Sequence, residues 1–171
     1  MRPELSGSVP RMADLELTRT PGDRRLYELA GVGTLRLEGW FSRSATAEAR
    51  EQRWQIARRG VFTAVIEATD AAGSIAGEFH GRALRRGGTL RWVERPFELR
   101  SSSIWRERYA LVEGERELAT IEGKGWGKHP VKLSIDDAAS IEPGLLLFAA
   151  FVVRALAEDA QSSAGSAGAG G

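Results

Sequence analysis

The sequence predicts a mainly β protein, a closed antiparallel barrel that encloses a hydrophobic helix near the C-terminus. Two observations support this prediction. Short segments of alternating apolar and polar residues, separated by turn residues, fill most of the chain, and one stretch near the end is apolar on every side. Short strands with turns every 8–12 residues or so are typical of a sandwich or a barrel. A helix that is apolar all round must be surrounded by protein or by lipid.

The apolar stretch runs from Gly144 to Ala157, with Arg154 as the one interruption of its apolar surface. Pro143 precedes it and suits the first position of a helix, where the missing N–H has no cost. Spanning a membrane takes roughly 20 apolar residues, whereas this stretch rises only about 20 Å as a helix. We therefore expect a helix buried in protein. A helix-grip fold, with the helix across an open sheet, is disfavoured because it would leave one helix face in water.

The rest of the chain reads as roughly ten to twelve short strands. Residues 45–52 are ambiguous, because Ala, Glu and Arg favour a helix, but they also lead into a strand at 54–56. A helix is about 10–12 Å across and needs a wider barrel than one of eight strands, which its own side chains fill. The strand candidates are 14–18, 25–29, 34–40, 54–56, 61–68, 75–80, 89–93, 97–100, 105–111, 118–122 and 131–136.

Aromatic residues within these strands are expected in the core. They include Trp40, Trp54, Trp92 and Trp105. Trp105 would share one strand face with Tyr109 and Leu111, and Glu107 falls on that apolar face without an evident reason.

The length of 171 residues fits one domain. We expect a flexible N-terminal arm over 1–10, a single barrel domain over 11–160, and a disordered Gly/Ala/Ser tail over 161–171.

Composition narrows the function classes. The formal net charge of +1 gives no bulk field for nucleic acid, and the absence of cysteine excludes disulfides, thiolate nucleophiles and Cys-based zinc sites. The N-terminus lacks the apolar run of a signal peptide, so we expect a cytoplasmic protein without a transmembrane span. The excess of arginine over lysine suggests a GC-rich genome of bacterial type.

The serial hairpins ending in a short apolar helix resemble the tubby C-terminal-like superfamily, in particular its LURP-one-related branch. The likeness rests on 61–79, with its turn at 70–73, on 109–121 and above all on 143–156. It is a likeness of pattern over roughly 15–157, without a diagnostic motif. It implies a barrel of about 12 strands threaded by a hydrophobic helix, and a superfamily that includes phosphoinositide-binding and scramblase members. The cysteines, the calcium-binding acidic segment and the longer apolar helix of scramblases are missing here.

The candidate ligand-binding residues are Lys124, Trp126, Lys128 and Lys132, in and after a glycine-rich loop. These three lysines are the whole lysine content of the chain. Lysines beside an aromatic ring suit an anionic headgroup, although lysine also serves to keep a strand edge soluble. Gly127-Lys128 departs from a phosphate-binding loop, because Glu122 and His129 stand where glycine and Ser or Thr are required.

Other polar groups are expected to be structural or solvated. Arg82, Arg85, Arg86 and Arg91 surround one turn and read as solvated arginines. His80 and His129 do not have metal-ligand spacing. No catalytic signature, metal site or cofactor motif stands out. We therefore expect a non-enzymatic binding barrel that contacts an anionic lipid surface, peripherally at a membrane, or a protein partner. The alternative is an enzyme whose site is assembled from scattered residues.

Overall fold

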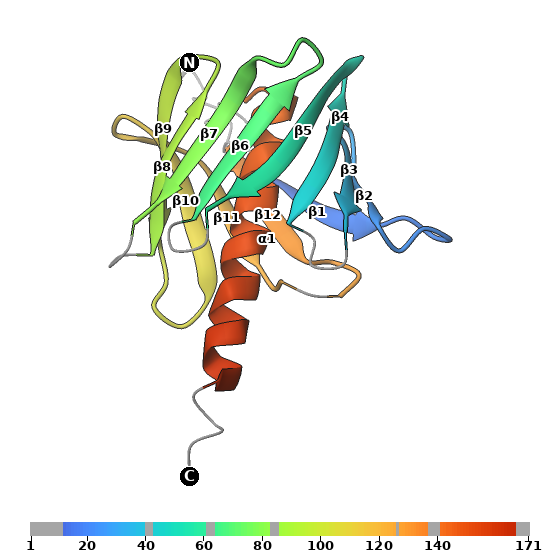
Figure 1. Ribbon diagram of the computed structural model, residues 1–171. Helices are drawn as coiled ribbons and strands as arrows, with labels where there is room; N and C mark the ends of the chain where they lie inside the picture. The colour runs from blue at the N-terminus through green and yellow to red at the C-terminus, as the bar shows by residue number, and fades with distance from the viewer. Residues whose placement is uncertain are drawn as a thin grey trace, which may run out of the picture.

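The computed structural model confirms the predicted fold class. Twelve antiparallel strands form one closed barrel in the described residues, and a single helix runs through it (Figure 1). The structure describes residues 12–39, 43–60, 64–82, 86–125, 127–136 and 141–166. The elements are β1 (Met12–Arg19), β2 (Leu26–Leu29), β3 (Gly33–Glu38), β4 (Ser44–Ala49), β5 (Gln52–Arg59), β6 (Val65–Asp70), β7 (Ile75–Gly81), β8 (Gly87–Trp92), β9 (Arg95–Ser101), β10 (Glu107–Glu113), β11 (Arg116–Gly123), β12 (Val131–Asp136) and α1 (Pro143–Ser166).

Each strand pairs with its neighbours along the chain, and β1 pairs with β12 to close the barrel. The ambiguous segment 45–52 is strand β4 followed by a tight turn into β5, because β3 and β5 hold it in register on both sides. Its inward residues Ala45, Ala47 and Ala49 are buried in the core. Alanine on this wall leaves room for the helix, and this tertiary requirement overrides its helix propensity.

The N-terminal half of α1 is enclosed on all sides. The residues from Leu145 to Val153 are each at most 4% exposed. The Phe148 ring lies 5.6 Å from the Trp92 ring, which joins the helix to the barrel wall. The helix is therefore the centre of the core, as its apolar circumference predicted. Within the described chain, no helix has both the length and the apolar character that crossing a membrane requires.

The helix is longer than its apolar stretch and continues to Ser166. Residues 161–166, expected to begin a disordered tail, are helical, and the side chains of 161–165 are exposed. Two causes extend the helix: alanine favours helical backbone, and Gln161 Nε2 donates a hydrogen bond of 2.6 Å to the Lys124 carbonyl oxygen. The rest of the expected tail, 167–171, and the expected arm, 1–10, lie outside the described residues.

Successive antiparallel strands place their connections alternately at two rims of the barrel. At the helix-start rim, Gly144 lies against the rings of Trp54 and Trp92, and Trp92 Nε1 donates to Glu142 Oε2 at 2.9 Å. The helix-exit rim carries the β7–β8, β9–β10 and β11–β12 connections. The last turns of α1 project beyond this rim (Figure 1).

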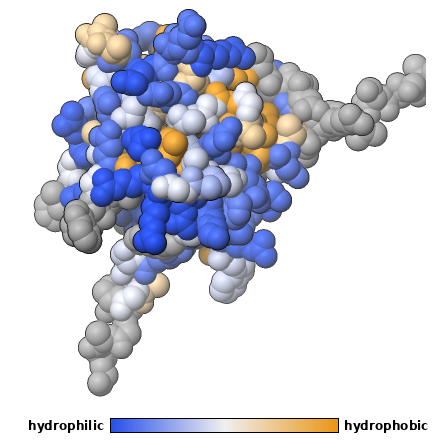
Figure 2. Space-filling view, turned by 90° about the vertical axis from the view of Figure 1, so that its right-hand side faces the viewer, coloured by the Kyte–Doolittle hydropathy of each residue, from blue (hydrophilic) through white to orange (hydrophobic). Residues whose placement is uncertain are grey.

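The outer wall is mainly hydrophilic, with small interrupted apolar areas on the face that Figure 2 shows. Cross-strand ion pairs are common on it, for example Arg53 with Glu48 at 2.6 Å and Arg95 with Glu113 at 2.8 Å. Such exposed pairs are typical of a solvated surface and contribute little to stability. Among the described residues, the most exposed large apolar side chains and an open pocket lie at the helix-exit rim.

Candidate functional site

The β9–β10 connection at the helix-exit rim presents the two most exposed large apolar side chains among the described residues. Ile104 is 77% exposed and Trp105 is 89% exposed. The prediction that Trp105 lies in a strand and faces the core was therefore wrong, whereas Trp54 and Trp92 are buried as expected. Trp40 lies outside the described residues.

A serine explains why the chain turns before Trp105 instead of continuing as a strand. Ser103 Oγ accepts hydrogen bonds from the backbone N–H groups of Trp105 and Arg106, at 3.2 and 3.1 Å. This local bond competes with strand pairing, as short hydroxyl side chains do. Strand β10 consequently begins only at Glu107.

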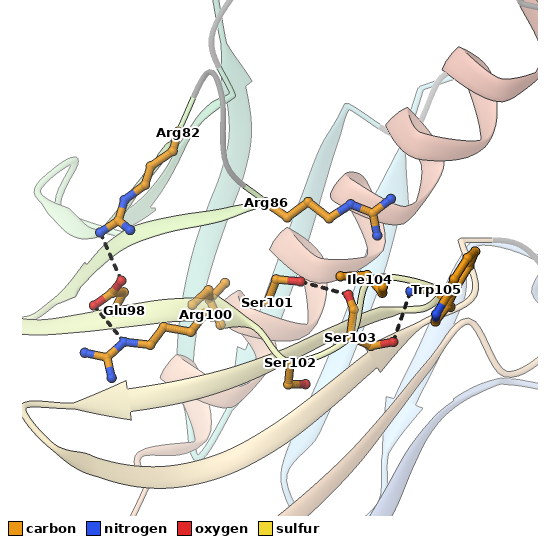
Figure 3. Close-up of a pocket in the computed structure, with 10 residues that line it drawn as sticks. Arg82, Arg86, Glu98, Arg100, Ser101, Ser102, Ser103, Ile104 and Trp105 are labelled. Atoms are coloured by element: carbon orange, nitrogen blue, oxygen red, sulfur yellow. Dashed lines mark hydrogen bonds and ion pairs between the residues drawn. The ribbon is translucent and has the colours of Figure 1, made fainter.

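An open pocket of about 920 Å³ lies beside this apolar tip, within the size range of ligand sites. Figure 3 shows Arg82, Glu98 and Arg100 at one side of the pocket, and Arg86 at the side where Trp105 lies. It thus joins a charged side to an apolar side. Its lining comes from the two ends of the β7–β8 connection, from β9 and from the β9–β10 connection: Arg82, Arg86, Glu98, Leu99, Arg100, Ser101, Ser102, Ser103, Ile104 and Trp105.

One carboxylate holds the arginine pair at the charged side. Glu98 Oε1 lies 2.9 Å from Arg82 Nη2, and Glu98 Oε2 accepts a hydrogen bond of 3.1 Å from Arg100 Nε. The side chains of Arg82 and Arg100 remain 43% and 48% exposed, so their other nitrogens are accessible from solvent. The pair therefore offers fixed N–H donors of the kind that bind phosphate or carboxylate oxygens.

Glu107, which the sequence pattern left unexplained, holds the third arginine of the pocket. Its Oε1 lies 3.1 Å from Arg86 Nη1, and its Oε2 accepts a hydrogen bond of 2.5 Å from the hydroxyl of Tyr109. Tyr109 is buried, and burial together with the adjacent Glu107 carboxylate raises the pKa of its hydroxyl. The tyrosine therefore remains a proton donor to Glu107 at neutral pH.

The predicted lysine site is placed at two different surfaces. Lys124 and Lys128 are exposed in the β11–β12 connection at the helix-exit rim. Lys132 is exposed on the outer wall, in register with Glu16 of β1 and Glu122 of β11. Trp126, the aromatic member of the predicted site, lies outside the described residues. The rim thus gathers two of the three lysines, and Lys132 lies between acidic neighbours.

The helix leaves the barrel between charged groups. Arg58 of β5 makes two hydrogen bonds with the Asp159 carboxylate, at 2.8 and 2.6 Å. Arg154 is 4% exposed, and its Nη2 lies 2.6 Å from Glu158 Oε1. Burial lowers the pKa of the Arg154 guanidinium and raises the pKa of the Glu158 carboxyl. In the described chain, Arg154 Nε and Nη1 have no hydrogen-bond partner.

Only a weak feature of the sequence points to this pocket, which we call the arginine pocket after Arg82, Arg86 and Arg100. In the sequence, Arg82 and Arg86 read as solvated turn residues. The sequence feature that could have indicated the pocket is the high local density of arginine and serine around two successive connections. This density indicates a pocket only when the barrel is known, because the barrel places the two connections side by side. The described residues contain no group of three or more histidine and acidic side chains placed to hold a metal ion.

Comparisons with protein-family models, with curated proteins and with solved structures found no match for this chain.

Proposed function

We propose that this protein is a non-catalytic binding barrel whose helix-exit rim contacts an anionic phospholipid surface. The observation that carries the proposal is the pairing of an exposed apolar tip, Ile104 and Trp105, with the arginine pocket beside it. An apolar tip enters the interfacial layer of a bilayer, where tryptophan is favoured, while arginine nitrogens remain at the depth of the phosphates.

Three successive connections around the rim supply cationic or apolar side chains that suit such a surface. The β7–β8 connection has Arg82 and Arg86 at its ends, the β9–β10 connection presents the apolar tip, and the β11–β12 connection carries Lys124 and Lys128. Each cation near an anionic surface contributes on the order of 1 kcal/mol, so a few of them with one tryptophan support reversible, salt-sensitive binding.

The test is co-sedimentation with phosphatidylcholine vesicles that contain or lack phosphatidylglycerol, at low and high salt. We expect the parent protein to bind only the anionic vesicles and to dissociate at high salt. The double variant Ile104→Ser/Trp105→Ser should lose most of this binding. Its matched control is Ile75→Ser/Val93→Ser, which removes the two exposed apolar residues of the helix-start rim, 52% and 57% exposed, and should bind like the parent.

The lysines give a second comparison. Lys124→Gln/Lys128→Gln should weaken binding at low salt, whereas Lys132→Gln on the outer wall should have little effect. Equal loss in the two apolar double variants, or no binding of anionic vesicles by the parent, would contradict the proposal. In the latter case a protein partner for the same rim is the remaining interpretation.

A further inference from the structure

The arginine pocket is less positive than its three arginines suggest. Glu98 contacts both Arg82 and Arg100, and Glu107 contacts Arg86. Among the described residues, these three positive and two negative groups leave a formal net charge of +1. The charged side of the pocket alone, Arg82 and Arg100 with Glu98, also carries a net charge of one.

Glu98 is fixed in this place by the barrel wall. It stands in the middle of β9, opposite Thr89 of β8 and Val112 of β10, so both of its neighbours are neutral. Its side chain is 23% exposed, and each of its carboxylate oxygens contacts a different arginine. The carboxylate thus orients two guanidinium groups in advance, which lowers the entropic cost of binding a ligand.

The same carboxylate also limits which ligand the arginines accept. A singly charged oxyanion matches the net charge of the Glu98 side and binds to the remaining guanidinium nitrogens. Among the described residues of this side, a ligand with further negative charges meets no additional uncompensated cation, and it lies close to the Glu98 carboxylate, where like charges repel.

We propose that Glu98 is a specificity-determining residue that restricts the pocket to a singly charged oxyanion, such as the phosphodiester of a phospholipid headgroup, and disfavours polyanions. This inference rests on the proposed function and names the ligand class of the same site. Glu98 acts by charge and by orienting Arg82 and Arg100, and the ligand contacts those arginines.

The experiment compares two vesicle types of equal total headgroup charge, one containing phosphatidylglycerol and one containing a phosphatidylinositol bisphosphate. The parent should bind the phosphatidylglycerol vesicles at least as well. Glu98→Gln leaves the shape of the side chain unchanged and releases one positive charge. It should raise the affinity for the bisphosphate vesicles about fivefold relative to phosphatidylglycerol, because one further cation acts at the surface.

The matched control is Glu113→Gln, which frees Arg95 on the helix-start rim and changes the total charge of the protein by the same amount. It should not alter the preference. Soluble glycerophosphoglycerol should displace the parent from vesicles at lower concentration than inorganic phosphate, which separates a headgroup site from a site for free phosphate.

Several outcomes would overturn the inference while the proposed function stands. They are a parent that prefers the bisphosphate vesicles, a Glu98→Gln variant with the parent's preference, an equal gain in Glu113→Gln, and stronger competition by inorganic phosphate. A parent that binds neither anionic vesicle contradicts the proposed function itself.

Discussion

The two rims of the barrel are built on different principles. At the helix-start rim, aromatic packing closes the barrel: the Trp54 and Trp92 rings are 5.5 Å apart, and Gly144 has room for no side chain, because a Cβ there would lie 2.4 Å from the Trp92 ring. The turns on this rim are tight, with φ of 45° at Val93 and 64° at Glu94, a conformation that suits two-residue hairpins.

The helix-exit rim is closed by ion pairs and carries exposed charged and apolar side chains. Arg58 and Asp159 pair where the helix leaves the barrel, and Arg154 and Glu158 pair just inside. The rim's connections then present arginines, lysines and an exposed tryptophan to solvent. The two rims therefore differ in kind: packed aromatic rings hold the start of the helix at one rim, and exposed charged and aromatic side chains surround its exit at the other.

The largest effect is expected where the helix is enclosed, between the two rims. Leu147 is fully buried, and Leu147→Asp would place an unpaired charge in the core. The variant should not fold, which circular dichroism and thermal melting of the purified protein will show. Leu147→Met conserves volume and serves as the control, with a cost below about 1.5 kcal/mol. A variant with aspartate at this position that melts like the parent would mean that the helix is not the core.

The second prediction compares the loss of stability when a tryptophan is replaced at each of the two rims. Trp92→Ala should reduce the free energy of unfolding by about 3–5 kcal/mol, because Trp92 packs on Trp54 and Phe148 and is 2% exposed. Trp105→Ala should change it by less than about 0.5 kcal/mol, because the side chain is 89% exposed. Urea unfolding of both variants measures the difference. Similar costs for the two substitutions would remove the distinction between the rims.

The third prediction concerns the rim where charges, not packing, close the barrel. Arg154→Met leaves the Glu158 carboxylate without its buried partner and should cost about 3 kcal/mol. The double variant Arg154→Met/Glu158→Leu should have a stability within about 1 kcal/mol of the parent or higher, because replacing a buried ion pair by apolar groups is often neutral or stabilising. If the double variant is more than about 1 kcal/mol less stable than the parent, the pair is a source of stability, and the helix-exit rim resembles the helix-start rim.

One wrong prediction and one arrangement that the sequence does not reveal show the limit of local patterns. Trp105 fits the apolar–polar alternation of the strand that begins two residues later. This alternation does not reveal that the chain turns at Ser103 before the strand begins. Arg82 and Arg86 look like ordinary turn arginines, because Glu98 and Arg100, their neighbours in space, come from the next hairpin. The unexplained position of Glu107 on an apolar face also has a tertiary cause. Its partner Arg86 precedes β8, whereas Glu107 begins β10, so the two residues meet only in the barrel.

The sequence by itself determined the fold class, the enclosed helix and most strands, because these follow from local periodicity and from an apolar circumference that only a surrounding protein can satisfy. Only the tertiary structure decided the site. A closed barrel sets the β7–β8, β9–β10 and β11–β12 connections beside one another on one rim, and the ion pairs of Glu98 and Glu107 join residues from different hairpins. Such contacts join side chains that are far apart in the sequence, and only the assembled barrel brings them together.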